Sequence, residues 1–407
     1  MVNKFYYPRG GTERYLFSLS GLLREKGHKV IPFSTFHEKN IDTEYSSYFL
    51  LGVDFDEFFK KGILSAATGL RTNALYSFEA RKKLESLIKR ERPDIAHLHN
   101  IHYHITPSIL PILKEKDIPI IWTLHDYALI CPNSHFLSDG KICEACSNGR
   151  YYRPILERCK RGSFGASLIA GFGAYLYRWM GLYNLVDLFL CPSDFLRKKM
   201  IEYGFDSKRL ITIPNFLEID IPVPSYGNKA YVLYFGRLSE EKGVETLIKS
   251  AEKIPYLNFK FVGDGPQGRI LKEMVKERGL TNVQFLGELK RKELYSLITE
   301  ALFVIIPSVW YENCPYSILE SFLLGKPVIA SEIGGIPELV DDGIDGLLFE
   351  PGNDEDLAAK IKQLLSDKDS LKQMGERARA KVERLYSPEV HYERIVRAYN
   401  MVLSKHH

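Results

Sequence analysis

The stretch LFVIIPSVWYENCPYSILESFLLGKPVIAS, residues 302–331, decides the fold of this chain. It holds an apolar run (302–308), a loop, a helical pattern from Pro315 to Gly325, and a second apolar run (326–331). Apolar strands joined by helices are typical of parallel sheets that are covered on both faces. Because such units recur along the chain, we predict an α/β protein of two doubly wound, Rossmann-like domains that face a cleft.

The apolar runs divide into two groups of five. The predicted strands are residues 29–34, 95–99, 119–125, 188–193 and 209–214, then 231–236, 259–263, 283–287, 302–308 and 326–331. Residues 214–229 lie between the groups, hold three prolines, and show no clear period, so we expect a linker there. The predicted domains are 1–213, with a cysteine-containing insertion at 131–162, and 229–387. A final helix over 388–407 needs a partner for its apolar face in either domain, and crossing back to the N-terminal domain would supply one.

Composition narrows the class of protein. The 407 residues are 45% apolar and 26% charged, which is an ordinary composition for a globular enzyme. The net charge of +4 is small for this length and does not indicate nucleic-acid binding. The first residues lack the pattern of a signal peptide, and no run of 18 apolar residues occurs. We expect a cytoplasmic protein, and six cysteines in this length favour a reducing compartment.

Two carboxylates flank the helix start in residues 302–331. Pro315 suits the first helical position, with Asn313 or Cys314 as the cap, and free amide groups there are suited to phosphate or sugar hydroxyls. Glu312 lies in the loop before this helix, and Glu320 interrupts its apolar face. The two glutamates are placed to hold the hydroxyls of a sugar nucleotide. The alternative is a solvated Glu312 and a Glu320 paired with a lysine.

A second strand–loop–helix unit points the same way. In YVLYFGRLSEEKGVETLI, residues 231–248, Gly236, Arg237 and Lys242 follow a strand and precede a helix. Two cations beside a glycine are suited to a diphosphate.

The chain resembles a retaining family 4 glycosyltransferase of the GT-B fold, also described as group 1 glycosyl transferases. The C-terminal half carries the resemblance in FGRLSEEKGVETLI, FVGDGP, VQFLGEL, the segment 307–340 and DGIDGLLFEPGNDEDLA. The N-terminal half agrees through NKFYYPRGGTERY, LREKGHKV, DIAHLHN and TLHDYALICP. The resemblance implies a hexosyltransferase that uses a nucleotide-sugar donor, with a saccharide or lipid-linked acceptor in cell-surface glycan synthesis.

The resemblance also implies roles for residues. The catalytic group would be His125, Arg237, Lys242 and Glu312. The donor-binding group would be Gly10, Gly11, Gly236, Asn313, Cys314, Pro315, Tyr316 and Glu320, and the acceptor would meet His99 and Asn100. Because the leaving diphosphate is thought to take the acceptor proton in this family, we expect no protein nucleophile and no metal requirement in catalysis. His125 would be a positioning group before a base.

Two other functions stay open at this stage. GDGPQG, residues 263–268, matches the dinucleotide fingerprint and would suit a nicotinamide-dependent enzyme, although it follows the second strand of its domain. A non-catalytic nucleotide-sugar-binding protein is the third hypothesis.

Two further segments carry signals of their own. Cys131, Cys143, Cys146 and Cys159 have a spacing that suits structural zinc, with ordinary reduced cysteines as the alternative. Residues 150–190 are basic first and then aromatic and apolar. They would suit a peripheral contact with the inner face of the membrane, or a core helix.

Overall fold

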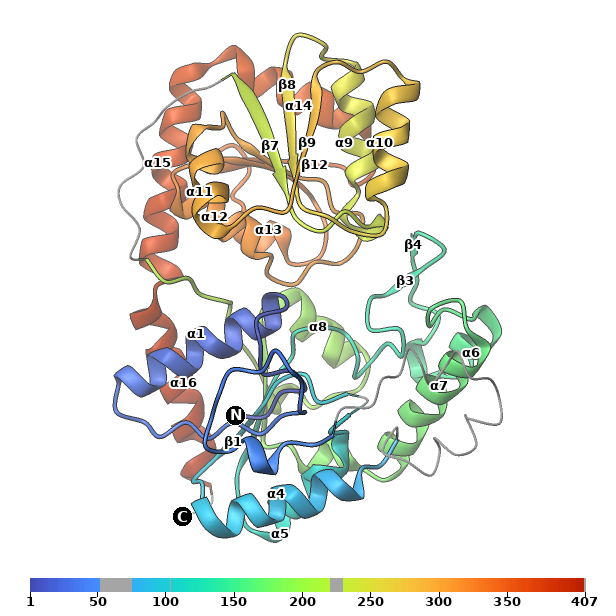
Figure 1. Cartoon of the computed structure of the whole chain (residues 1–407), viewed down its shortest axis with the longest axis vertical. Helices are drawn as coiled ribbons and strands as arrows, with labels where there is room; N and C mark the ends of the chain where they lie inside the picture. The colour runs from blue at the N-terminus through green and yellow to red at the C-terminus, as the bar shows by residue number, and fades with distance from the viewer. Residues whose placement is uncertain (52–74, 103, 220–229, 406–407) are drawn as a thin grey trace. The chain divides into compact units, whose positions relative to one another are not determined.

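The computed structural model describes residues 1–51, 75–102, 104–219 and 230–405 (Figure 1). The chain forms two compact units. Unit 1 holds residues 1–139, 143–214 and 391–407, and unit 2 holds residues 140–142 and 215–390. The boundary at Pro214 and Asn215 falls at the start of the predicted linker, of which residues 220–229 lie outside the described part.

Unit 1 is built on a parallel sheet of four strands. Their order is β1-β2-β5-β6, with β1 at Ala96–Leu98, β2 at Ile120–Thr123, β5 at Leu188–Cys191 and β6 at Leu210–Thr212. Val2 continues the sheet beyond β1 through parallel bridges to Leu98 and Phe33. The predicted strand at 29–34 is therefore wrong in extent, because Phe33 is its one bridged residue in the described structure.

Helices cover this sheet. They are α1 (Gly11–Glu25), α4 (Phe78–Glu91), α5 (Leu110–Glu115), α6 (Arg153–Glu157), α7 (Phe164–Trp179), α8 (Asp194–Glu202) and α16 (Pro388–Leu403). Most of α16 belongs to unit 1 although it ends the chain. Its Tyr399 hydroxyl lies 2.8 Å from His97 Nδ1, and its His391 Nε2 lies 3.0 Å from the Tyr15 hydroxyl of α1.

Unit 2 has a six-stranded parallel sheet in the order β12-β11-β10-β7-β8-β9. The strands are β7 (Tyr231–Phe235), β8 (Asn258–Val262), β9 (Val283–Gly287), β10 (Val304–Ile306), β11 (Val328–Ser331) and β12 (Gly346–Phe349). The chain runs outward from β7 to β8 and β9, then returns to β10 beside β7 and runs outward the other way. The carboxyl ends of β7 and β10 thus form the topological switch point, where open α/β sheets bind ligands.

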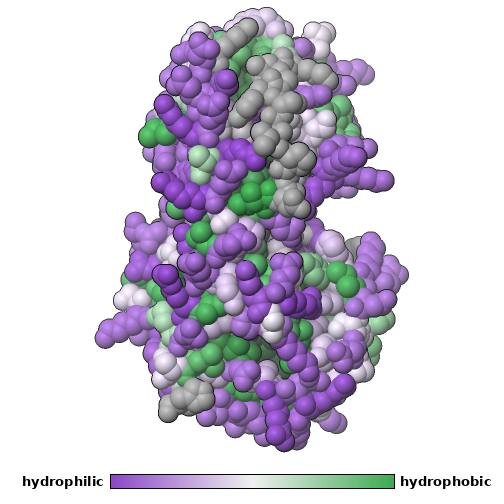
Figure 2. All heavy atoms as spheres, turned by 90° about the vertical axis from the view of Figure 1, so that its left-hand side faces the viewer, coloured by the Kyte–Doolittle hydropathy of each residue, from purple (hydrophilic) through white to green (hydrophobic). Residues whose placement is uncertain are grey.

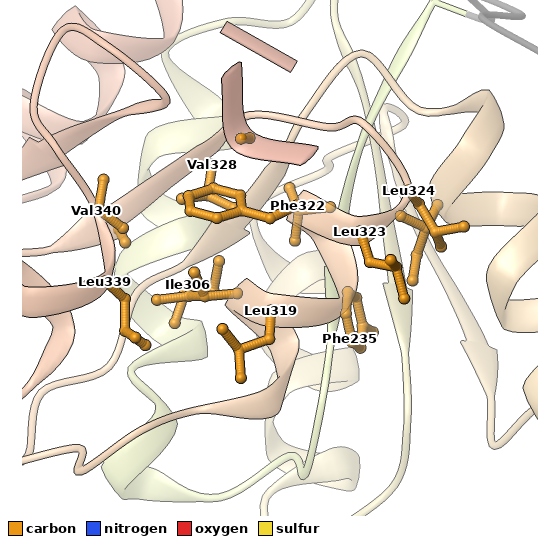
Figure 3. Close-up of a cluster of buried hydrophobic side chains, with 14 of the residues drawn as sticks. Phe235, Ile306, Leu319, Phe322, Leu323, Leu324, Val328, Leu339 and Val340 are labelled. Atoms are coloured by element: carbon orange, nitrogen blue, oxygen red, sulfur yellow. The ribbon is translucent and has the colours of Figure 1, made fainter. Parts of the chain in front are cut away.

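Two apolar clusters cover the two faces of this sheet, as a doubly wound fold requires. On one face α12 (Tyr316–Leu323) and α15 (Lys368–Leu385) pack on β10 and β11. Figure 3 shows Leu319, Phe322 and Leu323 of α12 among Ile306 and Val328 of these strands. On the other face lie α9 (Val244–Glu252), α10 (Gly268–Glu277) and α14 (Asp354–Ser366), and α11 (Arg291–Glu300) and α13 (Ile336–Leu339) complete the helices of this unit. The predicted parallel α/β architecture is confirmed.

Figure 2 shows one face of the molecule, on which hydrophilic residues dominate and hydrophobic residues form separate patches. Among the described residues, no helix is both long and apolar enough to cross a bilayer.

Candidate functional site

The centre of the site in unit 2 is an ion pair at the switch point. Lys242 Nζ lies 2.6 Å from Glu312 Oε1. Lys242 comes from the loop between β7 and α9, and Glu312 comes from the loop between β10 and α12. A backbone hydrogen bond holds the two loops together: Val309 N donates to Glu241 O at 3.0 Å. Gly243 (φ +61°) also lies so close to the second loop that a Cβ would meet Pro307 O at 1.9 Å.

Glu312 is a buried, ionised carboxylate. Its residue is 6% exposed, and its Oε1 also accepts from Ser308 Oγ at 2.8 Å. Burial by itself would raise the pKa of Glu312, but the charge of Lys242 and the hydrogen bonds that the carboxylate accepts hold this pKa below its usual value. Glu312 is therefore suited to accept from hydroxyl donors, and the alternative interpretation, a solvated loop charge, does not fit its burial.

Two glycines contact the backbone of Glu312. Gly334 has φ +61°, and a Cβ on it would lie 2.4 Å from Glu312 O. Gly335 N donates to the same carbonyl oxygen at 2.6 Å. The pair Gly334–Gly335 between β11 and α13 is thus a structural part of the site that the sequence prediction missed, although the double glycine itself was visible.

The start of α12 differs from the prediction. Pro315, with φ −68° and ψ 125°, is the extended residue before the helix, so neither Asn313 nor Cys314 is the cap, and the helix ends at Leu323. Pro315 has no amide hydrogen to offer a ligand. Cys314 is 6% exposed, and burial raises its pKa to about 12, so it stays a thiol. The amides of the helix itself begin with Tyr316, the first residue of α12.

Glu320 has a tyrosine as a partner. This glutamate is 7% exposed on α12, and Tyr295 of α11 donates its hydroxyl to Oε1 at 2.9 Å. Arg291 in turn donates to the Tyr295 hydroxyl at 3.0 Å and places its guanidinium 5.1 Å from the ring centre. No sequence signal could have selected Tyr295.

Arg237 and Gly236 follow β7 directly. Arg237 is exposed, and its carbonyl oxygen accepts from the Tyr234 hydroxyl at 2.8 Å. Gly236 has φ +153°, a value that favours glycine, and its amide donates to Val262 O at 3.0 Å. Arg237 is thus an exposed cation two residues beyond β7, with its carbonyl oxygen held by Tyr234.

The GDGPQG segment has a role that excludes the dinucleotide interpretation. A Cβ on Gly263 would lie 2.0 Å from Gly236 O, and one on Gly265 would lie 2.4 Å from Leu238 O. Gln267 N, at the start of α10, already donates to Leu238 O at 2.9 Å. These glycines let two loops of the protein pack closely, and they do not form an open phosphate cradle.

The predicted residues of unit 1 separate into buried and accessible groups. His99 is 1% exposed, and its Nδ1 lies 3.0 Å from His125 Nε2, so His99 positions His125 and does not face an acceptor. Burial lowers the pKa of His125 to about 4, which keeps this imidazole neutral near pH 7 and makes it a weak base. Tyr15 packs its ring against both histidines.

Asn100, Gly10 and Gly11 lie at the start of α1. Asn100 Nδ2 approaches Thr12 Oγ1 at 3.5 Å. Gly10 is extended, with φ −165°, and Gly11 is the first residue of α1. A Cβ on Gly10 would meet Glu13 Oε2 at 3.7 Å, an ordinary contact. Glu13, 5% exposed and bonded to Asn3, is a buried carboxylate that the prediction missed.

The four clustered cysteines are free thiols. Among the described residues, no three Cys, His, Asp or Glu side chains are arranged so that they could hold a metal ion. The four sulfurs nevertheless interact electrostatically with one another, and four backbone amides, those of residues 133–136, point at the sulfur of Cys131. The zinc site stays a prediction.

Comparison with known proteins identifies the family. The family described as Glycosyltransferase Family 4 matches residues 9–221, and Glycosyl transferases group 1 matches residues 216–381. The sulfoquinovosyl transferase SQD2 of Arabidopsis thaliana is 30% identical over 388 residues, which cover 93% of this chain and 68% of the relative.

Solved structures show the same fold. Sucrose-phosphate synthase from Thermosynechococcus elongatus has a TM-score of 0.73 and 18% identity, covering 99% of this chain and 96% of that one. Anabaena HepE in complex with UDP-glucose has a TM-score of 0.66 and 18% identity, covering 98% of each chain. Sequence and fold thus agree: this chain is a glycosyltransferase that belongs to family 4, with the GT-B fold.

Proposed function

We propose that this enzyme transfers a sugar from a nucleoside diphosphate sugar to a saccharide or lipid-linked acceptor, with retention of the anomeric configuration, in cell-surface glycan synthesis on the cytoplasmic side. The observation that carries the proposal is the Lys242–Glu312 pair at the switch point, with the Arg237 guanidinium on the same strand end. Cations and a buried carboxylate in one place match a donor that has an anionic diphosphate and a hydroxyl-rich ring.

The residues of unit 2 divide the donor between them. Arg237, Lys242 and the first amides of α12 bind the diphosphate, and Glu320 with Tyr295 binds the ribose hydroxyls. Lys242 is 26% exposed and can turn from Glu312 toward a phosphate oxygen. That movement releases Glu312 Oε1 to accept from the hydroxyls of the donor sugar.

Charge stabilisation supplies most of the rate. As the anomeric carbon becomes oxocarbenium-like, negative charge grows on the leaving diphosphate, and preorganised cations stabilise that charge. In comparable sites, removing one such group raises the barrier by about 3 to 4 kcal/mol. The leaving phosphate oxygen takes the proton of the acceptor hydroxyl as that hydroxyl attacks the same face. His125, neutral near pH 7, orients groups and does not need to carry the proton.

The acceptor assignment rests on chemistry alone. A saccharide acceptor presents hydroxyls, and Asn100 at the start of α1 is a partly exposed polar group that fits them. Catalysis by charge stabilisation needs no metal ion, and we propose none for the reaction.

A screen of nucleotide sugars tests the proposal. UDP-glucose comes first because a structural neighbour was solved with it. We expect slow release of nucleoside diphosphate from one donor without acceptor, lost in Lys242→Ala. The anomeric coupling of the first product formed with an acceptor, measured by NMR, should match that of the donor. Inversion, or no binding of any nucleotide sugar, would overturn the proposal.

A further inference from the structure

Helix α7 exposes its apolar side to solvent. From Phe164 to Tyr177 it holds no charged residue. The exposed residues are spaced by three or four positions and so share one side of the helix: Phe164 (53% exposed), Leu168 (43%), Phe172 (51%), Tyr175 (42%) and Trp179 (85%). We call these five residues, with Met180, the α7 stripe.

The concentration of exposed apolar groups here is unusual for this protein. Eighteen large hydrophobic side chains are exposed in the described part of the chain, and eight of them lie in residues 152–180. Besides the stripe, they include Tyr152 and Leu156, beside and in α6, which packs against α7 (Figure 1). Exposed apolar residues gathered on one helix face are typical of an interaction site.

The opposite side of α7 is fixed to the body of unit 1. It is lined by small residues, and a Cβ on Gly171 would lie 2.5 Å from Tyr151 O. Tyr177 donates its hydroxyl to Leu75 O at 2.7 Å, and Arg178 donates to Tyr203 O at 2.8 Å. Tyr175 packs edge-on against the buried Tyr151 ring, with ring centres 5.4 Å apart. Phe172 and Trp179 are 51% and 85% exposed, so these two can be changed without opening the core.

Basic residues flank the stripe. The segment before α7 carries Arg150, Arg153, Arg158, Lys160 and Arg161 against one acidic residue, Glu157. Arg150, Arg158 and Arg161 are exposed. An apolar helix face with Trp and Tyr, next to cations, matches the interface of an anionic membrane, where apolar groups enter the headgroup boundary and cations meet lipid phosphates.

The same basic segment interacts with polar residues that follow strands of the unit 1 sheet. Lys160, four residues before α7, interacts electrostatically with Lys4 and with His102. Asp126, next to His125, interacts with the same two residues. The basic segment before α7 thus reaches the part of unit 1 that holds Lys4 and His102.

We propose that the α7 stripe and the basic segment before it dock this enzyme on an anionic lipid bilayer. The helix lies in the interface and does not span it, since α7 has 16 residues. This placement makes the acceptor lipid-linked, a step that rests on the proposed function, whereas the docking itself does not depend on it.

Vesicle sedimentation of the full chain tests the docking. The probes are vesicles of phosphatidylcholine alone and of phosphatidylcholine with an equal amount of phosphatidylglycerol. We expect at least about tenfold stronger binding to the anionic vesicles, weakened by high salt. The double variant Phe172→Ser with Trp179→Ser should lose about tenfold of this binding. Tyr256→Ser with Ile270→Ser is the matched control, because both residues are exposed apolar groups of unit 2 and should leave binding unchanged.

Trp179 supplies a second readout in the unmodified protein. The chain has three tryptophans, of which Trp122 is 1% exposed and Trp179 is 85% exposed. Lipids brominated on their acyl chains should quench part of the fluorescence, and Trp179→Phe should remove that part. Soluble acrylamide should quench Trp179 in the absence of vesicles.

The possible results separate docking from catalysis. Binding that is equal for the stripe variant and its control, or a Trp179 that acrylamide cannot reach because protein covers it, would overturn the proposal. So would a stripe that holds two copies of the chain together, seen as a variant-sensitive dimer in sedimentation velocity without vesicle binding. Release of nucleoside diphosphate in solution should be the same in the stripe variant. If wild-type protein binds vesicles but uses no nucleotide sugar, the proposed function fails and the docking stands.

Discussion

Lys242 Nζ and Glu312 Oε1 lie 2.6 Å apart although 70 residues separate them, because β7 and β10 are neighbours in the sheet of unit 2. The contact joins a partly exposed cation to a buried, ionised carboxylate at the end of the sheet where open α/β folds bind ligands. A donor diphosphate competes for the same ammonium group, so this pair connects donor binding to the freeing of Glu312.

Lys242→Ala tests the charge-stabilising role. Turnover should fall by about 100-fold to 1,000-fold, because a preorganised cation at the leaving group is lost. The Michaelis constant for the donor should change less, since Arg237 and the α12 amides still bind it. Steady-state kinetics separates the two effects. Lys249→Ala, in the surface ion pair with Glu245, is the control. Wild-type turnover in Lys242→Ala would contradict the assignment.

Glu320→Ala tests nucleotide binding. We expect the affinity for nucleoside diphosphate to fall by about 10-fold to 100-fold, the effect of one or two hydrogen bonds to a charged group. Isothermal titration calorimetry with the diphosphate alone measures this directly. Tyr295→Phe keeps the carboxylate and removes the protein's own hydroxyl donor, so it should bind nucleotide far better than Glu320→Ala. If both variants lost the same nucleotide affinity, the role of Glu320 would be to hold Tyr295 of α11 and not to contact the nucleotide.

Gly334→Ala tests the backbone contact behind Glu312. The new Cβ would meet Glu312 O at 2.4 Å, so the loop must shift and turnover should fall with stability. Gly343→Ala is a matched control, because Gly343 has a similar φ of +75° but no atom within 4 Å of the added Cβ. Both variants lose about 1 kcal/mol of unfolding free energy from backbone strain. Only Gly334→Ala should also lose activity, and equal activity in the two would show that the close approach is not needed.

The buried histidines of unit 1 predict a pH-dependent stability. Burial lowers the pKa of His125 to about 4 and that of His391 to about 3, against an ordinary value of 6.5. The unfolded chain therefore binds protons first as the pH falls, so stability is full above about pH 6.5 and declines toward pH 4. Urea unfolding at several pH values should show this slope, and His391→Gln should reduce it. Exposed His135→Gln controls for loss of a surface imidazole. A pH-independent stability in this range would refute the burial argument.

The cysteine cluster predicts a measurable metal content. If Cys131, Cys143, Cys146 and Cys159 bind zinc, protein purified without chelator should contain about one zinc ion per chain by elemental analysis. Cys143→Ser with Cys146→Ser should remove it, whereas Cys191→Ser should not. Burial raises the pKa of the Cys131 thiol, and the hydrogen bonds from nearby backbone amides oppose this only in part, so a bound cation would be needed to hold the thiolate. Metal-free protein in which all four thiols of the cluster react with a thiol reagent would reject the zinc site and support ordinary reduced cysteines.

Local patterns determined much of the architecture. The continuous apolar runs predicted nine of the strands to within a few residues, since burial on both faces of a parallel sheet requires such runs. β12 was missed because Gly346–Phe349 is a short run bounded by turn residues, and the run at 29–34 pairs at Phe33 only. Lys242, Glu312 and Glu320 stood out because each polar residue followed a strand or broke an apolar face.

The tertiary structure decided what those residues touch. Which hydroxyl partners Glu320, which glycine approaches Glu312, and whether His99 is buried all depend on neighbours that are distant in the sequence. The segment around α7 shows this most clearly, because its composition was compatible with a core helix or a membrane contact. In the structure its small residues face Tyr151, Ile155 and Leu75, and most of its aromatic side chains stay exposed. Periodicity is a property of one element, whereas exposure depends on which elements pack beside it.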